Sequence, residues 1–275
     1  MTSPGFEIVK GDIPVVLHVP HSSRIIPPQV REAILLSDEQ LEIELDELTD
    51  SHTDLLATQS IVNLDKKPWI FRNKLSRLVI DPERFPDERE VMNQVGMGAV
   101  YLKTSTGLAL RDESFDNKPL ITEVFQPYAH SFTNLISELL QANGYVLIID
   151  VHSYRVKQHP NAVNHGQARP AICLGTDKFH TPEWLSKVAT ECFSSIGDVI
   201  QNQPYAGTYV PLDYYGKESA VLSIMLECRA DQLVDELLKP HAGLAKVADG
   251  LTGLISKSME KLAAGQGAKQ LRSAP

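Results

Sequence analysis

The stretch that most constrains the fold is residues 146–153, whose sequence is VLIIDVHS. It is a short, mostly β-branched apolar run, and such a run is typical of a strand buried on both faces in the middle of a parallel sheet. Open α/β sheets bind their ligands outside the carboxyl ends of these strands. We therefore expect His152, with Asp150 two residues before it, to lie at a functional site.

The same arrangement occurs twice more along the chain. Residues 14–23 predict a strand that runs into a turn carrying His21, and residues 221–229 predict an apolar strand that ends in Glu227. A single histidine after a strand is usually an ordinary loop residue. Three strands that end in two histidines and a glutamate instead indicate one assembled site.

The composition limits the class of protein and of partner. The chain has 275 residues, of which 43% are hydrophobic and 22% charged, so it can bury a core and is not of the disordered type. Its net charge of −9 argues against nucleic acid and anionic membrane surfaces, which attract basic patches. Small substrates remain open as partners, because a local cluster of arginines can bind an anion on an acidic protein, and the oligomeric state is also open.

Cysteine usage and the apolar runs indicate the compartment. The three cysteines have no CxxC spacing, which fits neither a disulfide framework nor a structural zinc site. Residues 1–10 contain no apolar core of a signal peptide, and nowhere are 18 consecutive residues apolar. We expect a soluble cytoplasmic protein.

Strands and helices are expected to alternate along the chain, which is typical of the α/β class. We predict three layers, with a mixed or mostly parallel sheet covered by helices on both faces, in one catalytic domain over residues 1–275. Residues 87–120 are expected to be an irregular insertion and residues 266–275 a frayed tail. The expected strands are 13–19, 60–64, 76–80, 146–151, 171–174 and 221–226, and the expected helices lie within 27–60, 127–143, 182–196 and 231–264.

The position of Asp50 depends on whether the predicted helical segment 27–60 is continuous. Ser37 and Gln40 have the spacing of a capping box, so a helix is expected to start there. If that helix is unbroken, Asp50 lies on its solvated face. If instead a new helix begins near Asp50, its carboxylate can point toward the sheet edge, and spacing alone does not decide between the two.

The residue types at the strand ends fit a catalytic zinc site, which needs about three N or O ligands and an open position. His21 and His152 supply two ligands, and we expect Asp50 to be the third, with His52 as its nearest rival. One divalent metal per chain is therefore predicted. Glu227 is the expected general base for the attacking water. Asp150 and Ser153, on either side of His152, are expected to contact the metal ligands and fix their orientation.

Substrate-binding residues are expected on two loops. Arg77 and Arg84 flank the predicted strand 76–80 and its following turn, and two arginines at a strand end can clamp a carboxylate. The turn-rich loop 202–209 contains two tyrosines and is a candidate lid, from which Tyr209 is the residue we expect to contact substrate.

Taken in order, these segments resemble a known family. VPHS at 19–22, TDSH at 49–52, RLVIDPER at 77–84, DVHS at 150–153 and the loop 202–207 are similar to motifs of the N-formylglutamate amidohydrolases. The resemblance covers about residues 14–230. It implies a fold like that of the zinc-dependent exopeptidases and a metal hydrolase that removes an N-formyl or other N-acyl group from an acidic amino acid, with a role in histidine degradation.

The resemblance also implies roles for individual residues, with some departures. The turn at 81–85 resembles the Asp-x-Asn-Arg-x-Phe turn of the exopeptidases, which implies that Arg84 binds the substrate carboxylate, but Glu83 replaces the asparagine. Arg24 stands three residues after His21, so the exopeptidase His-x-x-Glu ligand pair is absent. The remaining metal ligand must therefore come from another segment, and Asp50 is the expected residue.

Two other functions remain open at this stage. One is a metal-independent hydrolase with Ser22, Ser23 or Ser153 as the nucleophile, although no Gly-x-Ser-x-Gly turn is present. The other is a non-catalytic protein that binds an acyl amino acid. Glu227 favours an enzyme, because a binding protein has little use for a carboxylate base beside a metal.

Overall fold

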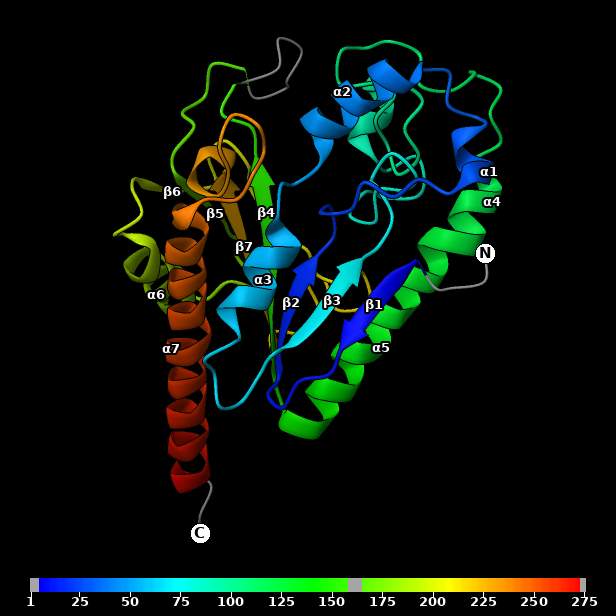
Figure 1. Ribbon diagram of the computed structural model, residues 1–275. Helices are drawn as coiled ribbons and strands as arrows, with labels where there is room; N and C mark the ends of the chain where they lie inside the picture. Colours follow the sequence, from blue (N-terminus) through cyan, green and yellow to red (C-terminus); the bar gives the residue numbers. More distant parts are fainter. Residues whose placement is uncertain (1–4, 158–164, 273–275) are drawn as a thin grey trace.

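The computed structural model describes residues 5–157 and 165–272, with the segment 265–272 given as helix backbone only. Within this part of the chain, seven strands form one sheet in the order β1-β3-β2-β4-β7-β5-β6 (Figure 1). The strands are β1 (Phe6–Val9), β2 (Val15–Val19), β3 (Trp69–Asn73), β4 (Val146–Tyr154), β5 (Ile172–Gly175), β6 (Val199–Gln201) and β7 (Val221–Arg229).

The sheet is mixed, with a parallel centre. Strand β2 pairs in parallel with both β3 and β4, and β4 pairs in parallel with β7. Strand β1 is antiparallel to β3, and β5 is antiparallel to β7. The prediction of a mixed α/β sheet is confirmed, and its parallel centre brings the carboxyl ends of β2, β4 and β7 to one edge.

Helices cover both faces of the sheet, as predicted. Figure 1 shows α5 along one face and α3, α6 and α7 along the other. The helices are α1 (Pro28–Arg31), α2 (Asp38–Leu48), α3 (Thr53–Ser60), α4 (Lys118–Leu120), α5 (Gln126–Asn143), α6 (Glu183–Phe193) and α7 (Ala242–Arg272), with 3₁₀ turns η1 (Val91–Val95) and η3 (Ala230–Gln232) and a π-helical turn η2 (Ile121–Phe125).

The apolar side chains of the central strands divide between two cores. Val16 and Ile148 pack with Phe132 of α5 on one face. Leu17 and Ile149 lie in the larger core on the other face, with residues of α3, α6 and α7. Alternate residues of a strand point to opposite faces, so both cores follow directly from the apolar runs in the sequence.

Two predicted strands are wrong. Residues 60–64 form the end of α3 and a turn, and the neighbouring strand is β3 at Trp69–Asn73. Residues 76–80 form turns, in which the Val79 N–H donates to the Ser76 carbonyl. Leu78 is buried in a small cluster with residues of α2, and Val79 and Ile80 are buried in another with residues of α4 and η2. Their apolar character therefore reflects burial and not pairing in the sheet.

The helical segment 27–60 is interrupted at Asp50. The capping box of Ser37 and Gln40 is present, but α2 ends at Leu48. His52 has the left-handed backbone conformation (φ 55°), and α3 begins at Thr53. The unbroken helix is therefore excluded, and Asp50 is 5% exposed.

The other predicted elements differ mainly at their ends. Helix α5 ends at Asn143 and is capped by Gly144, whose φ of 75° favours glycine. The last helix starts at Ala242, later than predicted, because residues 233–241 form a turn closed by the Val234–Pro240 bridge. Helix α7 includes most of the segment 266–275, and residues 273–275 lie outside the described part. Among the described residues, no helix is long and apolar enough to cross a membrane.

Candidate functional site

The register of the central strands places the chemically active side chains together. His18 of β2 lies beside Asp150 of β4, and His152 of β4 lies beside Glu227 of β7. Since alternate strand residues share a face, these side chains point to the face that α5 covers, at the carboxyl edge of the sheet. That edge is the predicted place for the site.

Three donor atoms from separate segments converge at this edge. His21 Nδ1 lies 3.3 Å from His152 Nδ1, and His152 Nδ1 lies 2.9 Å from Asp50 Oδ2. The third distance, from His21 Nδ1 to Asp50 Oδ2, is 3.8 Å. Two donors that share a tetrahedral zinc ion lie about 3.3 Å apart. The three separations, from 2.9 to 3.8 Å, lie around this value.

The interruption between α2 and α3 holds Asp50 in place. Its N–H donates to the carbonyl of His21 at 3.1 Å, and the N–H of Ser153 donates to Asp50 Oδ2 at 3.2 Å. His52, the rival ligand, has its Nε2 3.0 Å from the carbonyl oxygen of Leu238. Asp50 contacts both histidines, so it is the better placed of the two.

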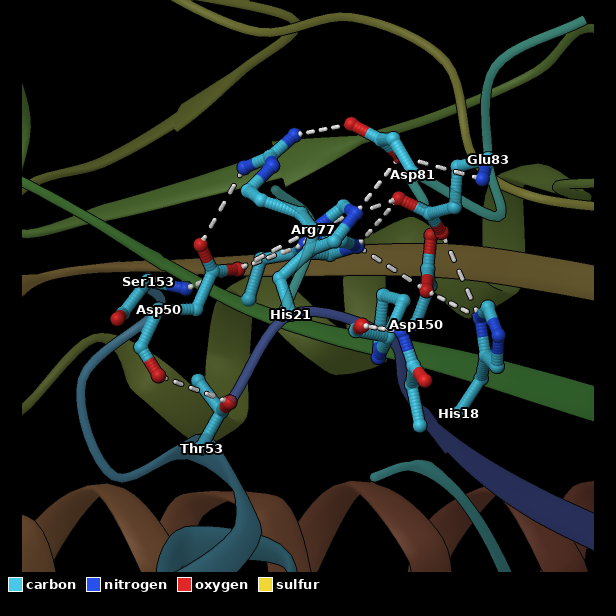
Figure 2. Close-up of polar contacts among 12 residues, drawn as sticks. His18, His21, Asp50, Thr53, Arg77, Asp81, Glu83, Asp150 and Ser153 are labelled. Atoms are coloured by element: carbon cyan, nitrogen blue, oxygen red, sulfur yellow. Dashed lines mark hydrogen bonds and ion pairs between the residues drawn. The ribbon is translucent and has the colours of Figure 1, made fainter. Parts of the chain in front are cut away.

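Each of the two histidines faces a buried aspartate through its remote nitrogen. His21 Nε2 lies 2.9 Å from Asp81 Oδ1, and His152 Nε2 lies 3.1 Å from Asp150 Oδ1. Asp150 is also 2.8 Å from Nδ1 of His18 (Figure 2). Carboxylates in this position orient metal-binding histidines and fix their tautomer.

Glu83 is a further acidic residue at the site that sequence reasoning missed. Its Oε2 lies 3.4 Å from His152 Nε2 and 3.7 Å from His21 Nδ1, and its Oε1 lies 3.5 Å from His18 Nδ1. In the described part of the chain, Glu83 belongs to two groups that could hold a metal: His21 with Glu83 and His152, and His18 with Glu83 and Asp150. Glu83 therefore competes with Asp50 as the third ligand.

Other supporting residues were also missed. His18 appeared only as the interior of an apolar strand, yet its Nε2 bonds the hydroxyl of Tyr128 at 2.7 Å. Tyr101, from the irregular segment, donates its hydroxyl to Asp81 at 2.8 Å. A polar residue within an apolar run was the available signal for His18, whereas no pattern in the sequence marks either tyrosine.

The residues present fit a bound divalent metal. Imidazole nitrogens and carboxylate oxygens are the donors that zinc uses in catalytic sites. Two buried carboxylate oxygens here, Glu83 Oε1 and Glu227 Oε2, have no hydrogen-bond partner among the described residues. Buried polar atoms are normally satisfied, so their state suits a site completed by a ligand.

Glu227 is a buried carboxyl group at the same edge of the sheet. It is buried beside His152, and its Oε2 has no hydrogen-bond partner within the described chain. Burial raises the pKa of this carboxyl to about 8. A carboxyl whose pKa lies near neutral pH can take and return a proton during a reaction.

The neighbouring charges of the site shift the pKa values of its buried histidines and carboxylates. Burial alone would lower the pKa of His152, but Asp150 and Glu83 raise it well above the ordinary value. Burial alone would raise the pKa of Asp81, but Arg77 and His21 hold it well below its usual range. In the metal-free site these shifts favour the protonated ring of His152 and the ionised carboxylate of Asp81.

Arg77 and Arg84 both approach Asp81, but their side chains differ in solvent exposure. Arg77 NH2 lies 2.7 Å from Asp81 Oδ2, and its NH1 lies 3.8 Å from Asp50 Oδ1. Arg84 Nε lies 3.6 Å from Asp81 Oδ2. The Arg84 side chain is 32% exposed and that of Arg77 is 16% exposed, so Arg84 has the freer guanidinium.

The site opens into a cavity of about 1160 Å³. The ring of Tyr209 stacks on His18 with centroids 4.9 Å apart, and its N–H donates to Asp150 at 3.2 Å. The predicted loop 202–209 therefore forms one wall. The cavity is lined by His21, Asp50, Arg77, Arg84, Asp150, His152, Ser153, Tyr209 and Glu227, together with Asp81 and Glu83.

Known proteins match most of this chain. Residues 13–234, more than half of the chain, match the family described as N-formylglutamate amidohydrolase. A curated relative, the N-formylglutamate deformylase of Pseudomonas aeruginosa, is 24% identical over 278 residues, covering 93% of this chain and 94% of that protein. All of the site residues named above lie within the matched range.

Solved structures share the fold. The crystal structure of N-formylglutamate amidohydrolase from Ralstonia eutropha JMP134 has a TM-score of 0.77 at 18% identity, covering 96% of this chain and 100% of that one. A gene product of Agrobacterium tumefaciens has a TM-score of 0.69 at 20% identity, covering 95% of this chain and 97% of that one.

Proposed function

The chain belongs to the N-formylglutamate amidohydrolase family, and we propose on this basis that it is a metal-dependent hydrolase of N-acyl amino acids. As a family member it is an enzyme that hydrolyses an amide bond. Its proposed substrate is an acidic amino acid that carries an N-formyl group or another N-acyl group, such as N-formylglutamate. Residues 1–275 are proposed to act as a single catalytic domain.

The metal would be held by His21 and His152 through their Nδ1 atoms and by Asp50 through Oδ2. A bound divalent ion such as zinc lowers the pKa of water and polarises a carbonyl group. Asp150 fixes the orientation of His152 from behind, and the N–H of Ser153 does the same for Asp50.

Glu227 is the proposed proton carrier. Its carboxylate takes a proton from the water that attacks the acyl carbon and delivers it to the nitrogen of the departing amine. The pKa of about 8 keeps the proton transferable near neutral pH. Ser23 and Ser153 donate their hydroxyls to main-chain carbonyls, which does not favour a serine nucleophile.

The substrate carboxylate would bind at Arg84, which has the more exposed guanidinium of the two arginines. Arg77 would support this charge from its position against Asp81. Tyr209, in the cavity wall, would contact the amino acid. A fixed guanidinium favours a planar carboxylate, so we expect weak binding of amides and esters of the same substrate.

One observation carries the proposal. Asp50, His21 and His152 come from three separate segments, yet their donor atoms lie within 3.8 Å of one another. Glu227 lies next to His152 on the neighbouring strand. No packing requirement brings two imidazoles and two carboxylates together in a protein interior, because each is costly to bury.

Release of formate from N-formylglutamate by the purified, zinc-loaded protein tests the proposal. We expect turnover that a chelator abolishes and added zinc restores. His152→Ala is expected to lose both zinc and activity, whereas the exposed His165→Ala should keep both.

Full amidase activity in His152→Ala would overturn the proposal. Turnover that resists chelation and is blocked by a serine-directed acylating reagent would favour a metal-independent hydrolase. Stabilisation of the protein by N-formylglutamate without any turnover, with zinc present, would favour a binding protein.

A further inference from the structure

We propose that His180 is a positioning residue that holds the loop 210–216 in place as a wall of the substrate cavity. The inference rests on the proposed function and deepens it, because it concerns how the cavity receives the amino acid. Residues 210–213 and 215 line the cavity. His180 is 1% exposed and does not line it, so it can act on the substrate only through the loop.

Both ring nitrogens of His180 contact main-chain groups. Nδ1 lies 2.7 Å from the carbonyl oxygen of Val221, the first residue of β7. The N–H of Gly216 donates to Nε2 at 2.8 Å. A carbonyl can only accept and an N–H can only donate, so the ring is neutral and carries its proton on Nδ1. One imidazole thereby joins the end of the loop to the start of a central strand.

The side chain of Tyr215 adds to this connection. Its ring stacks on that of His180, with centroids 5.6 Å apart and an angle of 26° between the planes. Its hydroxyl donates to Asp177 Oδ2 at 3.3 Å, and Oδ1 of the same carboxylate accepts the N–H of His180 at 3.0 Å. The N–H of Ser223 in β7 donates to the carbonyl of His180 at 2.9 Å. His180 is therefore fixed to the sheet through its own main chain, independently of the loop.

The two ends of the loop are held by different contacts. Just before it, the hydroxyl of Ser223 donates to the carbonyl of Tyr209 at 2.9 Å, and residues 210 and 211 are buried. Residues 212, 213, 215 and 216 are exposed. Between 212 and 216, the hydrogen bonds that reach described segments outside 208–218 are the two given above, to His180 and Asp177. Hydrogen bonding between this exposed part of the loop and the rest of the described chain therefore depends on these two residues.

Two amide substitutions separate the loop contact from the strand contact. The amide of Asn lies as many bonds from Cβ as Nδ1 of histidine does, and the amide of Gln as many as Nε2. His180→Asn can therefore keep the contact with Val221 but not the one with Gly216. His180→Gln can keep the contact with Gly216, since an amide oxygen also accepts. If His180 acts by holding the loop, only His180→Gln should preserve the cavity wall.

Steady-state kinetics of the zinc-loaded variants with N-formylglutamate test the inference. We expect His180→Asn to raise KM about 3–10-fold, the factor that one neutral hydrogen bond contributes to an equilibrium. Because the proposed metal ligands and Glu227 lie outside the loop, kcat should change less than about twofold. His180→Gln is expected to recover most of the loss in substrate binding.

His241→Asn is the matched control. His241 also lies between a main-chain carbonyl and a main-chain N–H, those of Asp231 and Gly243, at 3.1 and 2.9 Å. It is exposed and does not line the cavity. The same substitution at this position is expected to leave KM unchanged, so a rise in KM that is specific to His180 reports the loop.

NMR of the free protein tests the anchoring contact without turnover. Long-range ¹H–¹⁵N spectra, with His180 assigned by the signal lost in His180→Gln, should show the Nδ1–H tautomer. The amide of Gly216 should exchange with solvent faster in His180→Asn than in the wild type and in His180→Gln. The tautomer is read on the wild type, so the contact stays testable if a variant does not fold.

The two proposals fail in different ways. An Nε2–H tautomer of His180 in the wild type would overturn the positioning role, and so would a KM in folded His180→Asn equal to that of the wild type. Both results leave the amidase proposal intact. A wild type without amidase activity would overturn the proposed function, while the tautomer and the exchange of Gly216 would still decide whether His180 holds the loop.

Discussion

His152 and Glu227 are neighbours on β4 and β7, yet they have different proposed tasks. His152 is a metal ligand and Glu227 moves protons. We predict that Glu227→Gln retains zinc but lowers kcat about 10²–10⁴-fold, the usual contribution of a general base. Steady-state kinetics on metal-analysed protein measure this, with the exposed Glu236→Gln as a control.

Asp50 and Glu83 compete for the third ligand position. Asp50 lies 2.9 Å from His152 Nδ1, whereas Glu83 approaches the Nε2 of the same ring at 3.4 Å. We predict that Asp50→Asn weakens zinc binding by more than about 100-fold and Glu83→Gln by less than about tenfold. The reverse order would make Glu83 the ligand in place of Asp50.

Three of the residues found from the sequence lie where a recognisable strand ends. His21, His152 and Glu227 follow apolar runs, and the structure brings them together with Asp50. Their roles stay predictions. Glu83 lies in a loop whose path depends on tertiary packing, so no local pattern could place it beside two histidines.

Among the helices, an end could be predicted from the sequence where the residue at that end has a clear structural preference. Ser37 and Gly144 mark helix boundaries through their own chemistry, and both are where expected. The interruption at Asp50 has no such signal, because His52 adopts the left-handed conformation without being glycine. The predicted strand at 76–80 is wrong, because an apolar run indicates that a segment is buried and does not show that it pairs in a sheet.

Gly144 allows the scaffold to be tested separately from the site. It connects α5 to β4 with a φ of 75°, where a side chain is strained. We predict that Gly144→Ala lowers the free energy of unfolding by about 1 kcal/mol, as measured by urea denaturation. Its kcat/KM should equal that of the wild type at temperatures where both are folded. A large loss of activity there would show that the site depends on this junction.

At the scale of the whole molecule, the fold assembles one charged site from parallel strand ends. The sheet edge collects His21, His152 and Glu227 from β2, β4 and β7, and the loops add Asp50 and Asp81. Burying this many charges is costly without compensation. A bound metal cation would compensate the buried carboxylates. Metal binding should therefore activate the protein and also raise its free energy of unfolding.

Protons should compete with the metal at this site. The pKa of His152 is raised above its ordinary value in the metal-free protein, so the protonated ring persists to a higher pH than usual. A metal needs the unprotonated nitrogen, and we predict that zinc affinity falls as the pH is lowered from about 8 to about 6. Chelator competition across this range measures it, and an affinity that does not change with pH would contradict the prediction.

One metal ion is proposed to bind between His21, His152 and Asp50. Anomalous diffraction at the zinc edge from crystals of the zinc-loaded protein tests it most directly. We predict one strong peak at about 2.0–2.2 Å from Nδ1 of both histidines and from Oδ2 of Asp50. An empty position between the two imidazoles at saturating zinc would contradict the account.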